Sequence, residues 1–199
     1  MDHDRHGAKQ PHRFDPAKAP FLDDRARFEW VPLAEVLNLL DVPDRGLIVD
    51  FGTGTGTYAM EIAAARPDVK VVALDEQEPM LERLRAKLEA RPLTNVQPVM
   101  ARSEVARRLE GRADRILGLN VLHEVGDEAL EDLRALLKPG GRVAFIDWNA
   151  DVDREVGPPR DHVYSPEAAV ARVERFGFVV RERRLFRYHY ALVCSPTER

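Results

Sequence analysis

Apolar and polar positions along this chain follow two periods, which predict strands and helices in alternation. Short apolar runs indicate strands over residues 47–50, 69–75, 94–100, 113–120 and 142–148, with a final pair over 178–185 and 188–193. Apolar positions three or four residues apart indicate helices over 33–40, 59–66, 80–88 and 130–137, and another that begins at Ser165 and ends at Gly177. This order of elements is typical of an α/β protein with a parallel sheet.

The stretch over residues 47–63, LIVDFGTGTGTYAMEIA, predicts a buried strand, a glycine turn and the start of a helix. Its first residues form the apolar run expected of a parallel strand covered on both faces, and the run ends in Asp50. Gly52, Gly54 and Gly56 permit backbone angles that are closed to other residues, and they allow a ligand to approach the main chain. The turn is therefore predicted to cradle a ligand.

The spacing of the glycines distinguishes two classes of ligand. A dinucleotide-binding turn reads GxGxxG, whereas here the third glycine falls one residue early and Thr57 stands in its place. The form DxGxGxG resembles the first motif of class I S-adenosylmethionine-dependent methyltransferases. The resemblance implies S-adenosylmethionine as the cofactor and S-adenosylhomocysteine as its product, with the loop wrapped around the methionine end.

Later motifs extend this resemblance over residues 21–195. NVLHEV at 120–125 and LKPGGRVAFIDW at 137–148 are similar to small-molecule methyltransferases of the ubiquinone/menaquinone and arsenite type. The resemblance implies a Rossmann-like, doubly wound sheet of seven strands, mostly parallel with an antiparallel last strand, with the third strand outermost and helices on both faces. We expect one domain over 21–199, after a disordered leader over 1–20 that is polar and proline-rich.

The second predicted strand ends in Asp75, about 20 residues past the turn, where a carboxylate can accept both hydroxyls of an adenosine ribose. Capping of the next helix is the alternative. The resemblance places Glu76 beside the adenine. It also places Ala101-Arg102-Ser103 where the family usually has Gly-Asp-Ala, and since arginine accepts no hydrogen bond, Ser103 or backbone atoms must meet the adenine amino group. The expected cofactor-binding residues are Asp50, Gly52, Thr53, Gly54, Gly56, Tyr58, Asp75, Glu76, Met80, Arg102, Ser103 and Asn120.

Asn120 and His123 are expected at the carboxyl end of a central strand, where open α/β sheets bind ligands. His123 is the candidate catalytic residue because imidazole titrates near neutral pH, although packing or helix capping remains an alternative. A general base is needed only if the nucleophile arrives protonated. Aromatic faces such as Tyr58 or Trp148 would favour a cationic sulfur. The expected substrate pocket consists of Trp30, His123, Trp148, His162 and Tyr164.

Composition narrows the partners and the compartment. Lysine and arginine number 30 against 34 acidic residues, a net charge of −4 that gives no general attraction to phosphate backbones or anionic membranes. We therefore expect a small-molecule acceptor, with neither nucleic acid nor membrane as a partner. The polar N-terminus lacks a signal-peptide core, which predicts a cytoplasmic protein. Cys194 is the only cysteine, and the spacing of His3, His6 and His12 fits no compact metal site, so no metal is expected.

The predicted function is methyl transfer to a small-molecule acceptor by in-line displacement. A nicotinamide-dependent oxidoreductase is one alternative, disfavoured by the missing GxGxxG and by the lack of an evident Tyr-x-x-x-Lys pair. A non-catalytic cofactor-binding module is another, since no base is assigned. A nucleic-acid methyltransferase is disfavoured because residues 120–123 read Asn-Val-Leu-His instead of Asn-Pro-Pro-aromatic. Arsenite is disfavoured because several cysteines would be required.

Overall fold

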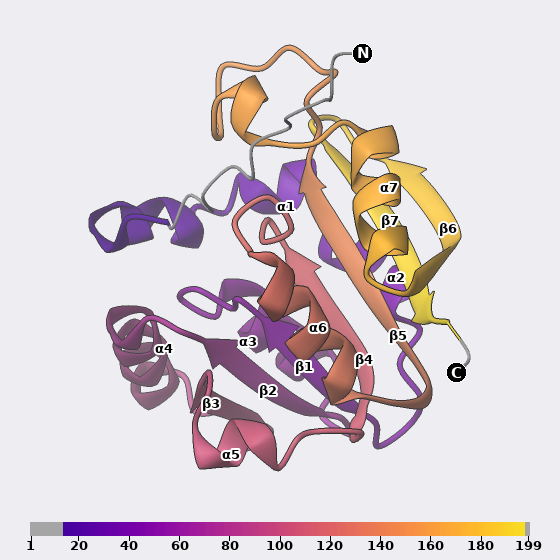
Figure 1. Ribbon diagram of the computed structural model, residues 1–199. Coiled ribbons are helices and arrows are strands. Elements are labelled where there is room, and N and C mark those ends of the chain that lie inside the picture. The colour runs from indigo at the N-terminus through magenta and orange to yellow at the C-terminus, as the bar shows by residue number, and fades with distance from the viewer. Residues whose placement is uncertain (1–13, 198–199) are drawn as a thin grey trace, which may run out of the picture.

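A computed structural model of the chain describes residues 14–197 (Figure 1). The strands are β1 (Leu47–Phe51), β2 (Lys70–Asp75), β3 (Val96–Met100), β4 (Ala113–Leu119), β5 (Leu137–Trp148), β6 (Phe178–Leu185) and β7 (His189–Pro196). The α-helices are α1 (Arg27–Trp30), α2 (Leu33–Leu40), α3 (Thr57–Ala65), α4 (Glu78–Ala90), α5 (Glu104–Arg107), α6 (Asp127–Leu136) and α7 (Pro166–Arg175). Two 3-10 helices, η1 (Pro16–Asp23) and η2 (Arg160–His162), complete the set within this range.

All seven strands join one sheet in the order β3-β2-β1-β4-β5-β7-β6. The first five are parallel, and β7 is antiparallel to both of its neighbours. The expected fold is therefore confirmed, including β3 as the outermost strand, where Pro98 removes no hydrogen bond from a central ladder. The strand order reverses between β1 and β4, and a ligand binds an open α/β sheet in the crevice outside the carboxyl ends at such a point.

Successive residues along each central strand face opposite sides of the sheet, and each side has its own apolar core. Ile48 packs with the side that α2, α3 and α4 cover, while the next residue, Val49, packs with the side that α5, α6 and α7 cover. Helices cover both sides of the sheet. This explains why these strands appear in the sequence as continuous apolar runs rather than alternating ones.

Pro139, Gly140 and Gly141, which separate the predicted helix over 130–137 from the predicted strand over 142–148, lie within β5. Ala113 pairs with Leu137, while Arg115 pairs with Arg142, so five residues of β5 oppose two of β4. Gly140 adopts a left-handed conformation with φ +77° inside this bulge. β5 thus begins directly after α6. The left-handed Gly140 lets the strand bulge, so that its extra residues fit opposite β4.

The packed part of the chain begins before residue 21, contrary to the expected boundary. Residues 1–13 of the predicted leader lie outside the described residues, but η1 starts at Pro16 and Ala19 is fully buried. Asp15 caps this helix, because its side chain accepts a hydrogen bond from the amide of Ala17 at 3.0 Å. Sequence composition alone missed the segment, since its few apolar residues pack by contact with distant elements.

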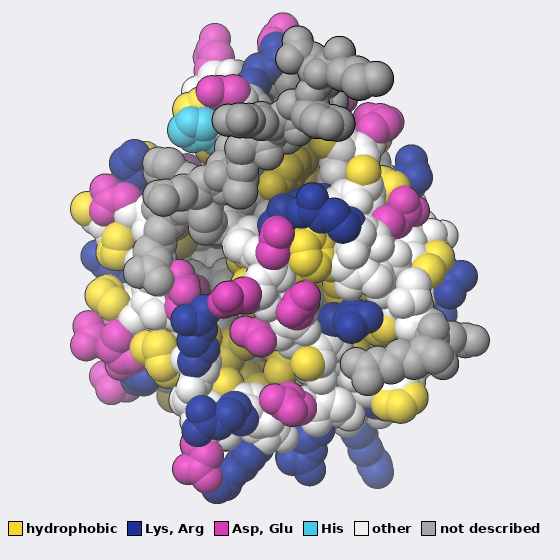
Figure 2. All heavy atoms as spheres, viewed as in Figure 1, with side chains coloured by type: hydrophobic (Ala, Val, Ile, Leu, Met, Phe, Trp, Pro, Cys, Tyr) yellow, Lys and Arg dark blue, Asp and Glu magenta, His cyan; other side chains and the backbone are white. Residues whose placement is uncertain are grey.

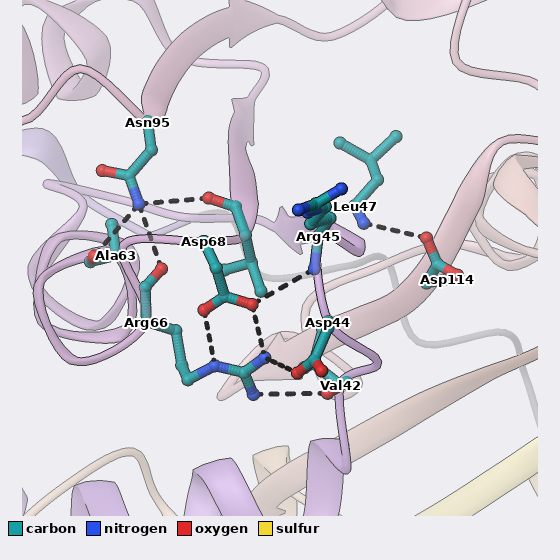
Figure 3. Close-up of polar contacts among 10 residues, drawn as sticks. Val42, Asp44, Arg45, Leu47, Ala63, Arg66, Asp68, Asn95 and Asp114 are labelled. Carbon is teal, nitrogen blue, oxygen red and sulfur yellow. Dashed lines mark hydrogen bonds and ion pairs between the residues drawn. The ribbon is translucent and has the colours of Figure 1, made fainter.

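Polar side chains connect the elements at the amino ends of the strands (Figure 3). Asn95, before β3, donates its side-chain amide to the carbonyl oxygens of Ala63, Arg66 and Val69 at 3.0–3.2 Å. It thereby fastens the end of α3 and the approach to β2. Arg66 also pairs with Asp68 at 2.8 Å and with the exposed Asp44 at 3.4 Å.

Within residues 14–197, each helix is too short or too polar to cross a membrane. The same part of the chain has no group of three or more His, Cys, Asp and Glu side chains arranged to share a metal ion. His3, His6 and His12, considered as metal ligands, lie outside it.

Replacing Asn95 with alanine should destabilise the fold by about 1–3 kcal/mol, because three carbonyl oxygens lose a shared donor. Chemical denaturation at neutral pH measures the difference. Asp44→Ala is the matched control, since its exposed ion pair is worth about 0–1 kcal/mol at most. Equal effects of the two substitutions would show that Asn95 does not fasten these elements.

Candidate functional site

The glycine turn follows β1 at the point where the strand order reverses. Gly52, Gly54 and Gly56 all have positive φ, at +70°, +56° and +75°. The amides of Gly52 and Thr53 donate to the carbonyl oxygen of Leu74 at 2.8 and 3.0 Å, which fixes the turn against the end of β2. The left-handed angles explain why the sequence requires glycine here.

Two buried carboxylates border this turn. Asp75 ends β2, and its oxygens accept hydrogen bonds from the amides of Gly54 at 2.8 Å and Gln77 at 2.9 Å. Asp50 is 3% exposed and accepts a hydrogen bond from the hydroxyl of Thr53 at 2.6 Å. Burial raises the pKa of Asp75, and it raises the pKa of Asp50 to about 6 despite the Thr53 hydrogen bond. Both charges therefore favour a cationic partner.

The loop after β3 holds the residues expected near an adenine. Arg102 is exposed and adopts a left-handed conformation with φ +61°. The Ser103 hydroxyl oxygen accepts a hydrogen bond from the amide of Ala106 at 3.1 Å and so caps α5. A hydroxyl oxygen has a second lone pair, which can accept from an adenine amino group. Glu76 is exposed and Met80 is fully buried under the same edge.

The end of β4 leads into Asn120 and His123. Asn120 adopts a left-handed conformation with φ +56°, and its side-chain Oδ1 is buried with no hydrogen-bond partner among the described residues. The backbone amide of His123 donates to Asp147 Oδ2 at 3.0 Å, and its Nδ1 lies 2.7 Å from Asp147 Oδ1. Asp147 is fully buried at the end of β5 and also accepts from the amide of Trp148 at 2.7 Å. His123 thus has a fixed orientation.

The charges around His123 are coupled. Burial lowers the pKa of His123, but the carboxylate of Asp147 outweighs burial and raises it above its ordinary value. The imidazole Nε2 lies 3.6 Å from a carboxylate oxygen of Glu124, which is too long for a hydrogen bond. Burial raises the pKa of Glu124 to about 7. Sequence reasoning missed Glu124, and no local pattern distinguishes it from an ordinary surface acid.

Aromatic rings form one wall where β5 ends and β7 begins. The ring of Trp30 lies 5.8 Å from that of Trp148 and 5.9 Å from that of Tyr188. Trp148 also packs against His189 with 4.1 Å between ring centroids. The structure thus brings together Trp30 and Trp148, two of the residues predicted for the substrate pocket. Tyr188 and His189 were not foreseen as site residues, because they join the wall only through the pairing of β7 with β5.

The other expected residues lie further out or serve a different purpose. The Tyr58 hydroxyl lies 2.8 Å from the carbonyl oxygen of Val31, and its ring lies under the guanidinium of Arg27 at 5.3 Å. We therefore correct its suggested role beside a cationic sulfur, since a cation of the protein already occupies the ring face. His162 is exposed on η2, and Tyr164 is half-buried with its backbone carbonyl bonded to the amide of Ala150.

Residues 14–23, here called the N-terminal strap, cross over the carboxyl edge of the sheet. Asp23 accepts hydrogen bonds from Thr55 at 2.6 Å, Thr57 at 2.8 Å and Lys87 at 2.6 Å. Leu22 is close to the turn, because a Cβ on Gly54 would meet its Cδ1 at 2.9 Å. At the other end of the strap, the side chain of Gln77 donates to the carbonyl oxygen of Phe14 at 3.2 Å. The strap thus covers the glycine turn.

Three observations show that these residues fit S-adenosylmethionine. The glycine turn brings the main chain within reach of a ligand, and Asp75 lies beside it. The buried Asp50 and the half-buried Glu124 both have raised pKa values, which a sulfonium and an ammonium would offset. The buried Oδ1 of Asn120 needs a hydrogen-bond donor, and an ammonium is one.

Comparison with known proteins agrees with this geometry. Residues 49–143 match a family model described as a methyltransferase domain. The fold is similar to a SAM-dependent methyltransferase from Aquifex aeolicus, with a TM-score of 0.83, 29% identity, and coverage of 92% of this chain and 98% of that one. The chain is 32% identical over 125 residues to demethylmenaquinone methyltransferase of Thermus thermophilus. The matched segment covers 62% of this chain and 56% of the relative.

Ribosomal RNA methyltransferases are also among the relatives. The chain is 32% identical over 119 residues to ribosomal RNA small subunit methyltransferase G of Thermotoga sp., covering 57% of this chain and 49% of the relative. The chain thus spans about half the length of the curated relatives it matches. The expectation that nucleic acid is no partner is overturned, because similar proteins are RNA methyltransferases and a net charge does not describe a local binding surface.

The pH dependence of stability should reveal the buried imidazole of His189. Burial lowers its pKa from 6.5 to about 3, so on acidification the unfolded chain takes up this proton first. Stability from this group is present above pH 6.5 and is lost as the pH falls. From pH 7 to pH 5 the wild type should lose about 2 kcal/mol more unfolding free energy than His189→Phe, which keeps a ring against Trp148.

Chemical denaturation of both proteins at the two pH values measures this difference. Asp50 and Glu124 also titrate in this range, but they are common to both proteins and cancel. An identical loss in wild type and variant would show that His189 is protonated in the folded chain.

Proposed function

We propose that the chain is a class I S-adenosylmethionine-dependent methyltransferase that transfers the methyl group of this cofactor to a small-molecule acceptor. The observation that carries the proposal is the convergence of two groups at one edge of the sheet. The glycine turn follows β1 and Asp75 ends β2, while His123 lies in the loop after β4 and bonds to Asp147 on β5. Cofactor and acceptor would thus meet across the point where the strand order reverses.

The cofactor supplies a methyl group that its sulfonium makes electrophilic, so the protein must position a nucleophile and exclude water. Asp75 is held by two amides and would orient the ribose of the bound cofactor. The Nδ1–H of His123 donates to Asp147, which leaves Nε2 as the proton acceptor of the neutral imidazole. His123 then takes a proton from an acceptor that arrives protonated, and Asp147 stabilises the imidazolium.

Coverage of the site supports a small acceptor. The N-terminal strap crosses the carboxyl edge, and residues 150–164, with the expected pocket residues His162 and Tyr164, connect β5 to α7 at the same edge. Lys and Arg side chains gather at the opposite edge of the molecule. Figure 2 shows a row of them along the lower edge of the view, where Figure 1 places α5 and the amino ends of the central strands. That edge is remote from the carboxyl ends.

Transfer of a labelled methyl group tests the proposal directly. The purified chain is incubated with methyl-labelled S-adenosylmethionine and, in separate reactions, with a panel of small phenols, quinols, amines and thiols or with small ribosomal subunits. Label on a small molecule supports the proposal. Label on ribosomal RNA alone would replace it with RNA methylation, and binding of NADH without S-adenosylmethionine would overturn the cofactor as well.

Asp75→Ala should weaken binding of S-adenosylhomocysteine by about 1.5–3 kcal/mol, because charge-assisted hydrogen bonds to the ribose are lost. Isothermal titration calorimetry measures the affinity. Asp75→Asn is the matched variant, since it keeps the size and one acceptor oxygen while losing the charge, and thermal unfolding checks that each variant is folded. A loss below about 0.5 kcal/mol would mean that Asp75 only braces Gly54 and Gln77.

Replacing His123 with alanine should lower kcat by about 10²–10⁴-fold if it is the general base, with little change in the KM for the cofactor. Because Asp147 raises the pKa of His123, the wild-type rate should fall as the pH drops through a value above 6.5. In Asp147→Asn this fall should move to lower pH, because the carboxylate charge is gone. If His123→Ala kept full activity and the same pH profile as the wild type, the histidine would have only a packing role.

A further inference from the structure

A narrow seam separates α1 from the carboxyl end of β4 and from the start of the antiparallel strand β7. Arg27, Trp30, Tyr58, Asn120 and His189 line it together with Val31 and Leu119, and it is too tight to hold a water molecule. The Oδ1 of Asn120 is buried and has no hydrogen-bond partner among the described residues. A buried acceptor of this kind calls for a partner that arrives with a ligand.

Arg27 provides a positive charge and hydrogen-bond donors in the same seam, where Asn120 provides an acceptor. Its Nη1 donates to the carbonyl oxygen of Leu22 at 2.7 Å, and its guanidinium lies 5.3 Å from the ring of Tyr58. Among residues 14–197, no carboxylate oxygen lies within 4.0 Å of this guanidinium. Arginine has five N–H donors, and it binds carboxylates through two of them at once. Arg27 is therefore a partly buried cation with donors to spare.

The sheet order indicates which end of the cofactor reaches this seam. Asp75, on β2, lies on one side of the glycine turn, and Asn120, on β4, lies on the other. If Asp75 holds the ribose, the adenine lies toward β3, because that is the direction in which the sheet continues. The sulfur and the chain beyond it then pass over the turn toward β4, where Asn120 and Arg27 face the seam.

We propose that Arg27 and Asn120 bind the α-amino-acid end of S-adenosylmethionine. Arg27 donates to the carboxylate, and Asn120 Oδ1 accepts a hydrogen bond from the ammonium. The proposal rests on the cofactor use proposed above and assigns two residues to it, one of which, Arg27, no sequence motif indicated. Entry of the ligand parts the seam and displaces Leu22, whose carbonyl oxygen bonds to Arg27 and whose side chain faces Gly54.

Removing the carboxylate from the ligand and the guanidinium from the protein tests this contact. Isothermal titration calorimetry compares S-adenosylmethionine with decarboxylated S-adenosylmethionine, which keeps the ammonium, on wild type and Arg27→Met. The wild type should bind the decarboxylated ligand about 10–100-fold more weakly, and Arg27→Met should bind the two ligands equally. The exposed neighbour Arg25 supplies the matched control, since Arg25→Met should discriminate as the wild type does.

Binding of 5′-methylthioadenosine, which lacks the whole amino-acid end, separates this contact from a loss of structure. Its affinity should be the same for wild type, Arg27→Met and Asn120→Gly, a substitution that the left-handed backbone tolerates. Asn120→Gly should weaken both S-adenosylmethionine and its decarboxylated form while keeping the discrimination between them.

Equal binding of the two S-adenosyl ligands by the wild type would overturn the proposal, and so would an Arg27→Met variant that loses 5′-methylthioadenosine as strongly as S-adenosylmethionine. In the second case Arg27 would serve only to hold the strap. A folded wild type that binds none of the three ligands would instead overturn the cofactor assignment itself. The two failures are thus distinguishable.

Discussion

Buried negative charge at the carboxyl edge of the sheet is the constraint on which the rest of the site depends. Asp50, Asp75, Glu124 and Asp147 all lie there, on or directly after the parallel strands and well shielded from water. Burial disfavours each charge, so each must find donors or a cation. Asp147 has His123 and Asp75 has two backbone amides, yet the pKa values of Asp50, Asp75 and Glu124 all remain raised. A dicationic ligand group, sulfonium and ammonium, would complete this balance.

The same constraint explains why the site is covered. A charged edge open to water would gain little from its partners, because water screens charges effectively. The N-terminal strap closes the edge from one side and is itself held by charge, since Lys87 and two threonines bind Asp23. Entry of the cofactor must therefore break contacts of Leu22 and re-form them around the ligand. The covering elements are part of the binding chemistry and not only a shield.

Local sequence signals predicted the scaffold of the site and much of its cofactor face. Neighbouring residues in the sequence were enough to single out the three alternate glycines, Asp75 at a strand end and His123 after β4. No local sequence signal marks Arg27, Glu124 or His189, because elements distant in the sequence form their environments. Net charge misled for a related reason: it sums over the whole surface, whereas recognition of RNA depends on where the charges lie.

The sequence by itself determined the order of strands and helices, the glycine turn and the identity of the groups that end each strand, because these follow from apolar periodicity and backbone sterics within a few residues. Only the tertiary structure decided that β7 lies against β5, that the strap lies on the turn and that Asp147 bonds His123. Those contacts join residues 24 or more apart in the chain. Their energy comes from burial and hydrogen bonding that exist only once the sheet has assembled.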